Sequence, residues 1–540
     1  MGLLHSSRDI WLAIKDLFLA GSFPGSTICV SALILVSLYL LQVYRRSQRT
    51  TRIRGPQSPG WVFGLSKTVL NSTATTELYE RWAVEYGPVY RVPVVLGESR
   101  VVLWDPKAIS HFFARDTWLY NQTPFNNTAV QIMIGRGILW ADGESHKRQR
   151  KALNPAFTAA AIRNLTSVFL DAAHKVTDND RMGWLRLIQH PPRRLDSAGI
   201  AILNHDFGAL DGHDSDVVHV VNESVLPANV SHDVIMLAQS FPSILKLPWR
   251  RTRFSQKQSL IFGKICHEML LRTRKEKETG GAERGDKSCL GLLLKAEDSG
   301  ESAGMTHEEV LAQARALLLA GSETTSASMT WALIELARNP DMQTRLRNEC
   351  LGFGPSPSYD ELTNKLPYLD AVANEVLRVH PSVTESIRSA TEEDVIPLSE
   401  PMRTATGTYT DSVCIPKGTV VVIPLAALNC SVSMWGPDAK EFKPSRWFEL
   451  NEDTREARET LHGYRHLMSF GDGPRMCLGR VFALTEFKAV LFVLVRNFVF
   501  EMADGPGVQI VDSFGPLPRP SVVGSAEAGG VPLRVRRYEV

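Results

Sequence analysis

The stretch Phe470-Gly-Asp-Gly-Pro-Arg-Met-Cys477-Leu-Gly-Arg480 places one cysteine in a glycine-rich loop, directly before a run of helix-forming residues, Val481–Val490. Glycines adopt backbone angles that a β-carbon forbids, so a flat ligand can approach such a loop closely. Because Cys477 comes at the start of the expected helix, free N–H groups and the helix dipole should lower the pKa of its thiol, with Arg475 adding a nearby cation. A thiolate held in this way can be an axial ligand of haem iron. The alternative is a buried cysteine in an ordinary glycine-rich turn.

The pattern Phe470, Gly473, Arg475, Cys477 and Gly479 resembles the haem-binding segment of the cytochrome P450 family at every expected position. The resemblance extends over roughly residues 56–540. It implies a mainly α fold with small β-sheets, of the α+β kind. It also implies haem b as the cofactor, with the Cys477 thiolate on the iron and the other four residues around the haem.

The composition is that of a globular protein with a sizeable core. The chain has 540 residues, of which 44% are hydrophobic and 22% are charged, and its net charge is +2. These values argue against a disordered or nucleic-acid-binding protein. An odd number of cysteines, scattered without CxxC spacing, argues against a disulfide framework or a zinc site and favours a reducing compartment. They are Cys29, Cys266, Cys289, Cys350, Cys414, Cys430 and Cys477.

An uncharged apolar run, Thr27–Val43, is about long enough to cross a thin bilayer such as that of the endoplasmic reticulum. The arginines that follow it should face the cytosol. A cleaved signal peptide is the alternative, but the run starts late and no small-residue cleavage site follows it. We therefore expect four parts: a lumenal or interfacial N-terminus (1–26), a transmembrane anchor (27–44), a basic and proline-rich hinge (45–60), and a haem-thiolate catalytic domain (61–540).

Seven Asn-x-Ser/Thr sequons offer a check on this topology. In a lumenal domain they would be candidate glycan sites, whereas in a cytosolic domain they would all stay unmodified. They begin at Asn71, Asn121, Asn126, Asn164, Asn222, Asn229 and Asn429.

His146 and Arg150 are spaced i, i+4, so they share one face of a predicted helix. By resemblance, they correspond to residues that bind the haem propionates. The family commonly has Trp at the first position, but His146 can still donate a hydrogen bond. Arg388 is a further propionate candidate. A solvated basic helix face is the alternative for His146. The remaining basic residues of this helix suit docking of an acidic redox partner: Lys147, Arg148 and Lys151.

Thr306-His-Glu-Glu309 is a capping box, and the pattern after it predicts a helix of over thirty residues that ends at Asn339-Pro340. Glu323 and Thr324 are polar residues within an apolar part of this helix, so they need a partner or a role. The Thr324 hydroxyl can bond back to the carbonyl of Ala320. By resemblance, this stretch matches the oxygen-activation motif, with Glu323 as the acid and Thr324 as the alcohol. The alternative is a core helix with one back-bonded threonine.

Glu375 and Arg378 form an i, i+3 pair on the next predicted helix, Tyr368–His380. In the family this pair is buried and is joined by a second arginine, which Arg446 matches, and its role is structural. The resemblance also implies a set of substrate contacts: Trp118, Phe125, Leu317, Ala320, Val383 and Thr384.

Strands are expected in three places. Alternation predicts a β-hairpin over Pro88–Trp104, and Ile415–Pro424 reads as a turn followed by a buried strand. The tail segments Arg519–Gly524 and Gly530–Val535 read as a closing hairpin whose turn lines the pocket.

The resemblance implies a monooxygenase that oxidises a lipophilic small molecule with O₂. Electrons would come from NADPH through NADPH–cytochrome P450 reductase, with cytochrome b5 as a second candidate donor. The segments Asn204–Gly208 and Leu210–Gly212 are similar to those of basidiomycete members, which favours a secondary metabolite such as a terpenoid. One alternative is a reductase-independent haem-thiolate isomerase or dehydratase, against which the Glu323–Thr324 pair argues. The other is a non-catalytic haem sensor or carrier.

Overall fold

The computed structural model describes nine longer segments of the chain, residue 72, the pair 293–294, and the isolated helical positions Ser37 and Leu41. The segments are 51–70, 74–178, 232–247, 250–278, 304–448, 459–505, 507–512, 518–523 and 530–539, with 293–294 between the fourth and fifth. Apart from Ser37 and Leu41, the predicted anchor lies outside these residues, as does the segment 204–212. Within the described part, no helix is both long and apolar enough to cross a bilayer.

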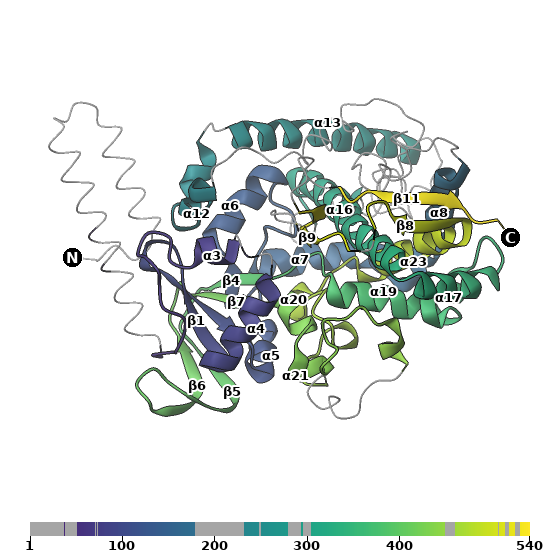
Figure 1. The fold of residues 1–540 in the computed structure, drawn as a ribbon. Helices are drawn as coiled ribbons and strands as arrows, with labels where there is room; N and C mark the ends of the chain where they lie inside the picture. The colour runs from purple at the N-terminus through teal and green to yellow at the C-terminus, as the bar shows by residue number, and fades with distance from the viewer. Residues whose placement is uncertain are drawn as a thin grey trace.

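Helices dominate the fold, as the sequence predicts, and α16 (His307–Arg338) runs through the middle of the molecule in Figure 1. The helix begins at Thr306, where both halves of the predicted capping box are formed, and ends before Pro340. The other α-helices are α3 (Ser66–Leu70), α4 (Thr75–Tyr86), α5 (Pro106–Ala114), α6 (Pro124–Met133), α7 (Gly143–Leu153), α8 (Ala159–Asp178), α12 (His232–Ser240), α13 (Arg250–Glu278), α17 (Pro340–Leu351), α18 (Tyr359–Asn364), α19 (Pro367–Val379), α20 (Leu425–Asn429), α21 (Val432–Trp435) and α23 (Arg480–Asn497).

A five-stranded sheet lies to one side of these helices, in the order β1-β2-β7-β4-β3 (Figure 1). Its strands are β1 (Val89–Pro93), β2 (Ser99–Leu103), β3 (Tyr120–Gln122), β4 (Ser386–Ala390) and β7 (Val420–Ile423). The predicted hairpin is confirmed, since β1 and β2 pair antiparallel from Val89–Leu103 to Pro93–Ser99. The predicted buried strand is β7, which is paired on both edges by β2 and β4 and is wholly apolar for that reason.

Two-stranded sheets complete the fold: β5 (Asp394–Arg403) with β6 (Tyr409–Ile415), β8 (Phe498–Met502) with β11 (Leu533–Arg537), and β9 (Ile510–Asp512) with β10 (Pro520–Val522). The predicted closing hairpin is therefore wrong, because its two segments pair with different upstream strands. Strand β8 buries Phe498 and Phe500 and needs a partner for its backbone groups, which β11 supplies while burying Leu533 beside them.

The apolar residues form two cores. One joins α8, α16, α17, α19 and α23, and the other joins α4 and α5 with the five-stranded sheet and β5–β6. Leu467 and Met468 belong to the sheet core, whereas Phe482 and Phe487 belong to the helical core. The cysteine loop between these residues therefore spans the junction of the two cores.

Residues 51–55, within the predicted hinge, pack against the folded unit. Ile53 is buried, Arg91 N–H donates to the carbonyl of Arg54 (3.0 Å), and Ala405 N–H donates to that of Arg52 (2.7 Å). A β-carbon on Gly55 would collide with the carbonyl oxygen of Arg91, so the chain approaches β1 too closely for any other residue.

Candidate active site

The loop around Cys477 is fixed by its own backbone. Cys477 N–H donates to the carbonyl of Phe470 (2.8 Å), which closes the loop, and Gly479 caps the start of α23. Gly471 and Gly473 have φ of +66° and +68°, angles that other residues rarely adopt. A β-carbon on Gly473 would also collide with the carbonyl oxygen of Phe113 at the end of α5. The glycines thus let the loop pass against α5 and present Cys477 in one position.

Cys477 is accessible although it lies among protein atoms. Its side chain is exposed, yet burial among protein atoms is the largest influence on its thiol and raises the pKa. Both observations hold if the sulfur borders an internal space rather than bulk solvent. The Gly479 N–H and the Arg150 and Arg480 guanidiniums oppose the rise without cancelling it. The predicted low pKa is therefore wrong for the metal-free thiol, although a coordinated metal ion deprotonates a thiol outright.

Four basic side chains from three separate segments gather on this side of the molecule. His146 and Arg150 come from α7, Arg388 from β4, and Arg475 from the cysteine loop. His146 is only 3% exposed, and its pKa falls from an ordinary value of 6.5 to about 4. Burial is the main cause, followed by the charges of Arg475, Arg150 and Arg388. The four predicted propionate and loop residues are thus close enough to act on one another.

Two carboxylates, Asp116 and Asp142, neutralise part of this positive charge. Asp116 accepts from Arg388 Nε (2.9 Å) and lies 3.4 Å from Arg475 Nε, while Asp142 accepts from Arg475 Nη2. Among the described residues, Arg150 forms no salt bridge with a carboxylate; burial lowers its pKa, and the Cys477 sulfur opposes this change. Three arginines and two carboxylates leave one positive charge in surplus beside the cysteine. The donor set therefore fits a haem, whose propionates are anionic and whose iron takes a thiolate.

Sequence reasoning missed three residues that hold this cluster: Asp116, Thr117 and Asp142. Thr117 is buried with φ of +72°, and its hydroxyl accepts from Arg475 Nη2 (3.1 Å) and from Gly143 N–H (3.0 Å). Its strained backbone thereby joins the cysteine loop to the start of α7. No local pattern signals the contacts with Arg388 and Arg475, because these arginines are hundreds of positions away in the chain. The direction of Arg475 was also unexpected, since its guanidinium points to the carboxylates and not to Cys477.

The middle of α16 has the predicted hydrogen bond. Thr324 Oγ1 donates to the carbonyl of Ala320 (2.7 Å), and Ser382 Oγ donates to the Thr324 carbonyl (3.0 Å). Ala320 is exposed and Glu323 and Thr324 are partly so, whereas the C-terminal part of this helix from Ser326 onward is mostly buried. An open space therefore borders α16 at this point. Glu323 is engaged by Arg519, a partner that sequence reasoning did not identify.

The predicted substrate-contacting residues differ in how exposed they are. Leu317 lies one turn before exposed Ala320 on α16, and Phe125 is partly buried in the first turn of α6. Val383, an apolar residue, is 40% exposed, and the Thr384 carbonyl accepts from Ala426 N–H (3.1 Å).

Trp118 differs from these residues. It is 48% exposed, and its ring centroid lies 6.0 Å from Nζ of Lys147, an exposed residue of α7. Trp118 is thus on a different side of α7 from buried His146.

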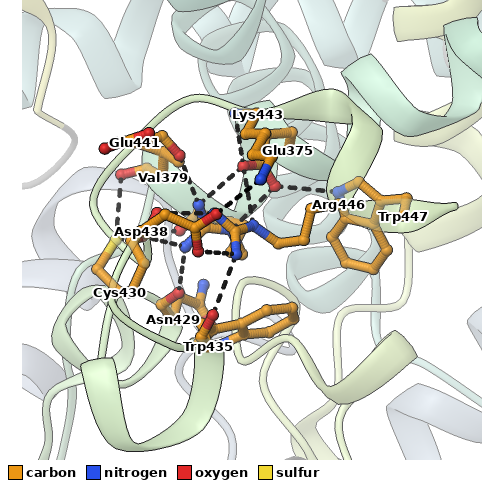
Figure 2. A network of polar contacts seen from close by, with 12 residues as sticks. Glu375, Val379, Asn429, Cys430, Trp435, Asp438, Glu441, Lys443, Arg446 and Trp447 are labelled. Atoms are coloured by element: carbon orange, nitrogen blue, oxygen red, sulfur yellow. Dashed lines mark hydrogen bonds and ion pairs between the residues drawn. The ribbon is translucent and has the colours of Figure 1, made fainter. Parts of the chain in front are cut away.

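The predicted structural trio is a buried ion cluster, and Figure 2 shows Glu375 and Arg446 within its network of polar contacts. Glu375 and Arg378 are fully buried and Arg446 is nearly so. Glu375 accepts from Arg378 Nη2 (2.8 Å) and Nε (2.9 Å), from Arg446 Nε (3.4 Å) and from Trp447 Nε1 (3.0 Å). The cluster ties α19 to the segment 438–447 that precedes the cysteine loop.

Arg148 is not available for docking a partner, contrary to expectation. Its Nη1 donates to Glu309 Oε2 (3.0 Å), and its Nη2 to Glu309 Oε1 (2.5 Å). This bidentate pair joins α7 to the first turn of α16. Lys147 remains exposed.

The fold and the site together match a known family. Residues 54–521 match the family described as cytochrome P450, so the chain belongs to the cytochrome P450 family. Membership makes it an oxidoreductase, and it implies a haem whose iron is ligated by a cysteine thiolate.

The relatives are fungal enzymes. Cytochrome P450 monooxygenase claQ of Ampulloclitocybe clavipes is 48% identical over 92% of this chain and 94% of its own. Cytochrome P450 monooxygenase 128 of Postia placenta is 35% identical over 95% of this chain and 97% of its own. Ganoderic acid synthetase CYP5150L8 of Ganoderma lucidum is 32% identical over 78% of this chain and 83% of its own. The chain is accordingly a cytochrome P450 monooxygenase.

Proposed function

We propose that this protein inserts one oxygen atom from O₂ into a lipophilic small molecule of fungal secondary metabolism, such as a terpenoid. The observation that carries the proposal is that Cys477 is accessible yet surrounded by protein atoms, with a surplus of positive charge beside it. The name of the Ganoderma relative, an acid synthetase, supports a role in secondary metabolism. Electrons would come from NADPH through NADPH–cytochrome P450 reductase, with cytochrome b5 as a second donor.

Cys477 is the proposed iron ligand. His146, Arg150, Arg388 and Arg475 would hold the propionates. When bound, the haem supplies the activation of O₂, and the protein supplies the thiolate, a restricted space and a route for protons. Glu323 and Thr324 would organise that route. Leu317, Ala320 and Val383 present apolar surface of the kind that a lipophilic substrate buries.

The proposed location is the endoplasmic reticulum membrane, with one transmembrane anchor at residues 27–44 and the catalytic domain in the cytosol. The late apolar run and the arginines behind it support this topology.

The test is expression in a fungal host with a cytochrome P450 reductase, followed by comparison of metabolites with those of the same host carrying Cys477→Ala. We expect a product that requires NADPH, gains one atom of ¹⁸O from ¹⁸O₂ and is absent with the variant. A product that forms without reductase or NADPH would instead identify an isomerase or dehydratase. Haem loading with no substrate-linked NADPH oxidation would identify a sensor or carrier.

A further inference from the structure

Glu323 is held by a residue from the far end of the chain. Arg519 Nη2 contacts Glu323 Oε2, and the two side chains are only 15% and 11% exposed. Arg519 lies directly before β10, which is far from α16 in the sequence but packs against it in the fold. A guanidinium in direct contact with a carboxylate, where little solvent reaches either group, favours the ionised carboxylate and fixes the orientation of its side chain.

The contact is one of several between the β9–β10 hairpin and α16. At the C-terminal end of α16, Arg338 Nη2 donates to the carbonyl of Val508 (2.8 Å). Further along, the side chain of Trp331 hydrogen-bonds to Asp512. Arg519 and Glu323 make the third contact, in the middle of the helix. The hairpin segment therefore runs antiparallel to α16 and meets it at successive points.

The three contacts differ in what lies next to them. Glu323 is followed directly by Thr324, whose hydroxyl borders the open space beside Ala320. Arg338 and Trp331 lie in the buried C-terminal half of α16. An arginine that served only to attach the hairpin could make its contact at any of these three places on α16. Only Arg519 binds the carboxylate beside Thr324.

We propose that Arg519 is a positioning residue for Glu323: it holds the carboxylate ionised and in one orientation beside Thr324, so that protons enter at that point. The proposal rests on the proposed function for its consequence in turnover, but the ion pair itself does not depend on it. A carboxylate without this partner would be free to rotate or to hold a proton. Proton delivery would then be misplaced, and reduced oxygen would leave as H₂O₂.

The test compares Arg519→Leu with Arg519→Lys and with a matched control, Arg338→Leu, all as haem-loaded full-length protein. Arg338→Leu removes another arginine that attaches the same hairpin to α16, but at a point remote from Glu323. Two measurements are made on each. The first is the infrared carboxylate band of Glu323, assigned by its loss in Glu323→Gln. The second is H₂O₂ and product formed per NADPH.

For Arg519→Leu we expect a shifted infrared band and a ratio of H₂O₂ to product higher by about tenfold, the factor that corresponds to about 1.4 kcal/mol. Arg519→Lys should recover part of both, since it keeps the charge but not the planar fork. Arg338→Leu should change neither. In the Glu323→Gln background, Arg519→Leu should raise H₂O₂ no further, because the two residues act as one unit.

Two results would overturn the proposal. An unchanged Glu323 band in Arg519→Leu would mean that the ion pair is absent in solution. Equal loss of coupling in Arg519→Leu and Arg338→Leu would mean that both arginines only attach the hairpin. If the wild-type protein oxidises no NADPH in response to any substrate, the proposed function fails, while the infrared comparison still decides whether Arg519 holds Glu323.

Discussion

Thr324 shows how one hydrogen bond decides what a side chain can do. Because its hydroxyl hydrogen is donated to the carbonyl of Ala320 at 2.7 Å, its oxygen presents only lone pairs to the open space beside α16. It can therefore accept a hydrogen bond from water there but cannot donate one while the bond to Ala320 lasts. Such a group holds water in place beside Glu323.

Thr324→Ala should leave haem binding and reduction unchanged, because neither needs the hydroxyl. We expect NADPH oxidation with substrate to continue, with less product and more H₂O₂ per NADPH. Thr324→Ser should recover much of the coupling, since it keeps the hydroxyl. Full coupling in Thr324→Ala would mean that the bond to Ala320 is only structural. Several substrates should be used, since a substrate with its own hydroxyl can replace the missing group.

His146 gives a pH-dependent prediction. Its pKa in the folded protein is about 4, against an ordinary value of 6.5. Between these values the unfolded chain takes up a proton that the folded chain does not. The free energy of unfolding should therefore fall as pH is lowered from 6.5 to 4, by on the order of 3 kcal/mol in the haem-free protein.

Denaturant unfolding of wild type and His146→Gln over this pH range measures the effect as a difference in slope. Haem loading should flatten the wild-type slope, because propionates would offset the charges of Arg150, Arg388 and Arg475 that depress the pKa. An unchanged slope on haem loading would count against a propionate beside His146.

At the scale of elements, the cysteine loop depends on two glycines, Gly471 and Gly473, for different structural reasons. Gly471 and Gly473 both have positive φ, but only at Gly473 would a β-carbon meet the backbone of Phe113; at Gly471 it would meet nothing within 4 Å. Gly471→Ala should thus carry the cost of the backbone angle alone, on the order of 1 kcal/mol. Gly473→Ala must also move the loop or α5.

We therefore expect Gly473→Ala to incorporate markedly less haem than Gly471→Ala when both are expressed and purified in parallel. The reduced carbon-monoxide spectrum, normalised to protein, measures this content. Equal haem content in the two variants would show that the close approach to Phe113 is unimportant.

The sequence predicts elements well where the determinants are local. The capping box at Thr306, the apolar pattern and Pro340 define both ends of α16, and the alternation in β1 and β2 defines their hairpin. The tail shows the limit of this reasoning. Strand β11 has an upstream partner, β8, whose need to pair becomes visible only once β8 is packed on the helical core.

The site shows the same limit. Cys477, Thr324 and the Glu375–Arg378 pair lie in recognisable local patterns. Asp116 and Arg519 do not, because each acts through a partner about 200 or more positions away. The sequence predicts a lowered pKa for Cys477, whereas the fold raises it, because burial depends on the whole fold and not on the local sequence.

At the scale of the whole molecule, Arg378 holds several segments together. All five of its N–H groups are used: two bond Glu375 (2.9 and 2.8 Å), and the others bond the carbonyls of Asn429, Ala439 and Glu441. Because Lys has only three donors, Arg378→Lys should leave buried acceptors unpaired and destabilise the protein by about 3–5 kcal/mol.

Thermal or denaturant unfolding and haem retention measure this loss. Arg163→Lys is the matched control, because Arg163 makes a bidentate pair with Asp360 but both side chains are more than half exposed. We expect it to cost under about 1 kcal/mol. Similar losses in the two variants would mean that the buried network contributes no more than a surface pair.

The N-terminal boundary of the folded unit permits a test of the proposed membrane anchor by two truncations. Residues 51–55 pack on β1 and on the β5–β6 turn, through Ile53 and the carbonyls of Arg52 and Arg54. Removing residues 1–45 takes away the apolar run and leaves this packing intact. It should release the protein from integral membrane attachment and keep its haem. Removing residues 1–56 should lower haem content and stability as well. Membrane fractionation measures the loss of attachment, and the reduced carbon-monoxide spectrum measures the loss of haem.

The same proteins test the orientation of the catalytic domain. Asn429 cannot carry a glycan in the folded state, because it is buried and its amide donates to Ser469 Oγ (2.8 Å) and accepts from Met468 N–H (2.8 Å). Asn126 and Asn164 lie on α6 and α8 and are at least partly exposed, so they report on the compartment. Protein made in fungal cells should show no mass shift at either site after glycosidase treatment. A glycan on Asn126 or Asn164 would place the domain in the lumen and overturn the proposed topology, whereas membrane attachment that survives removal of residues 1–45 would overturn the anchor alone.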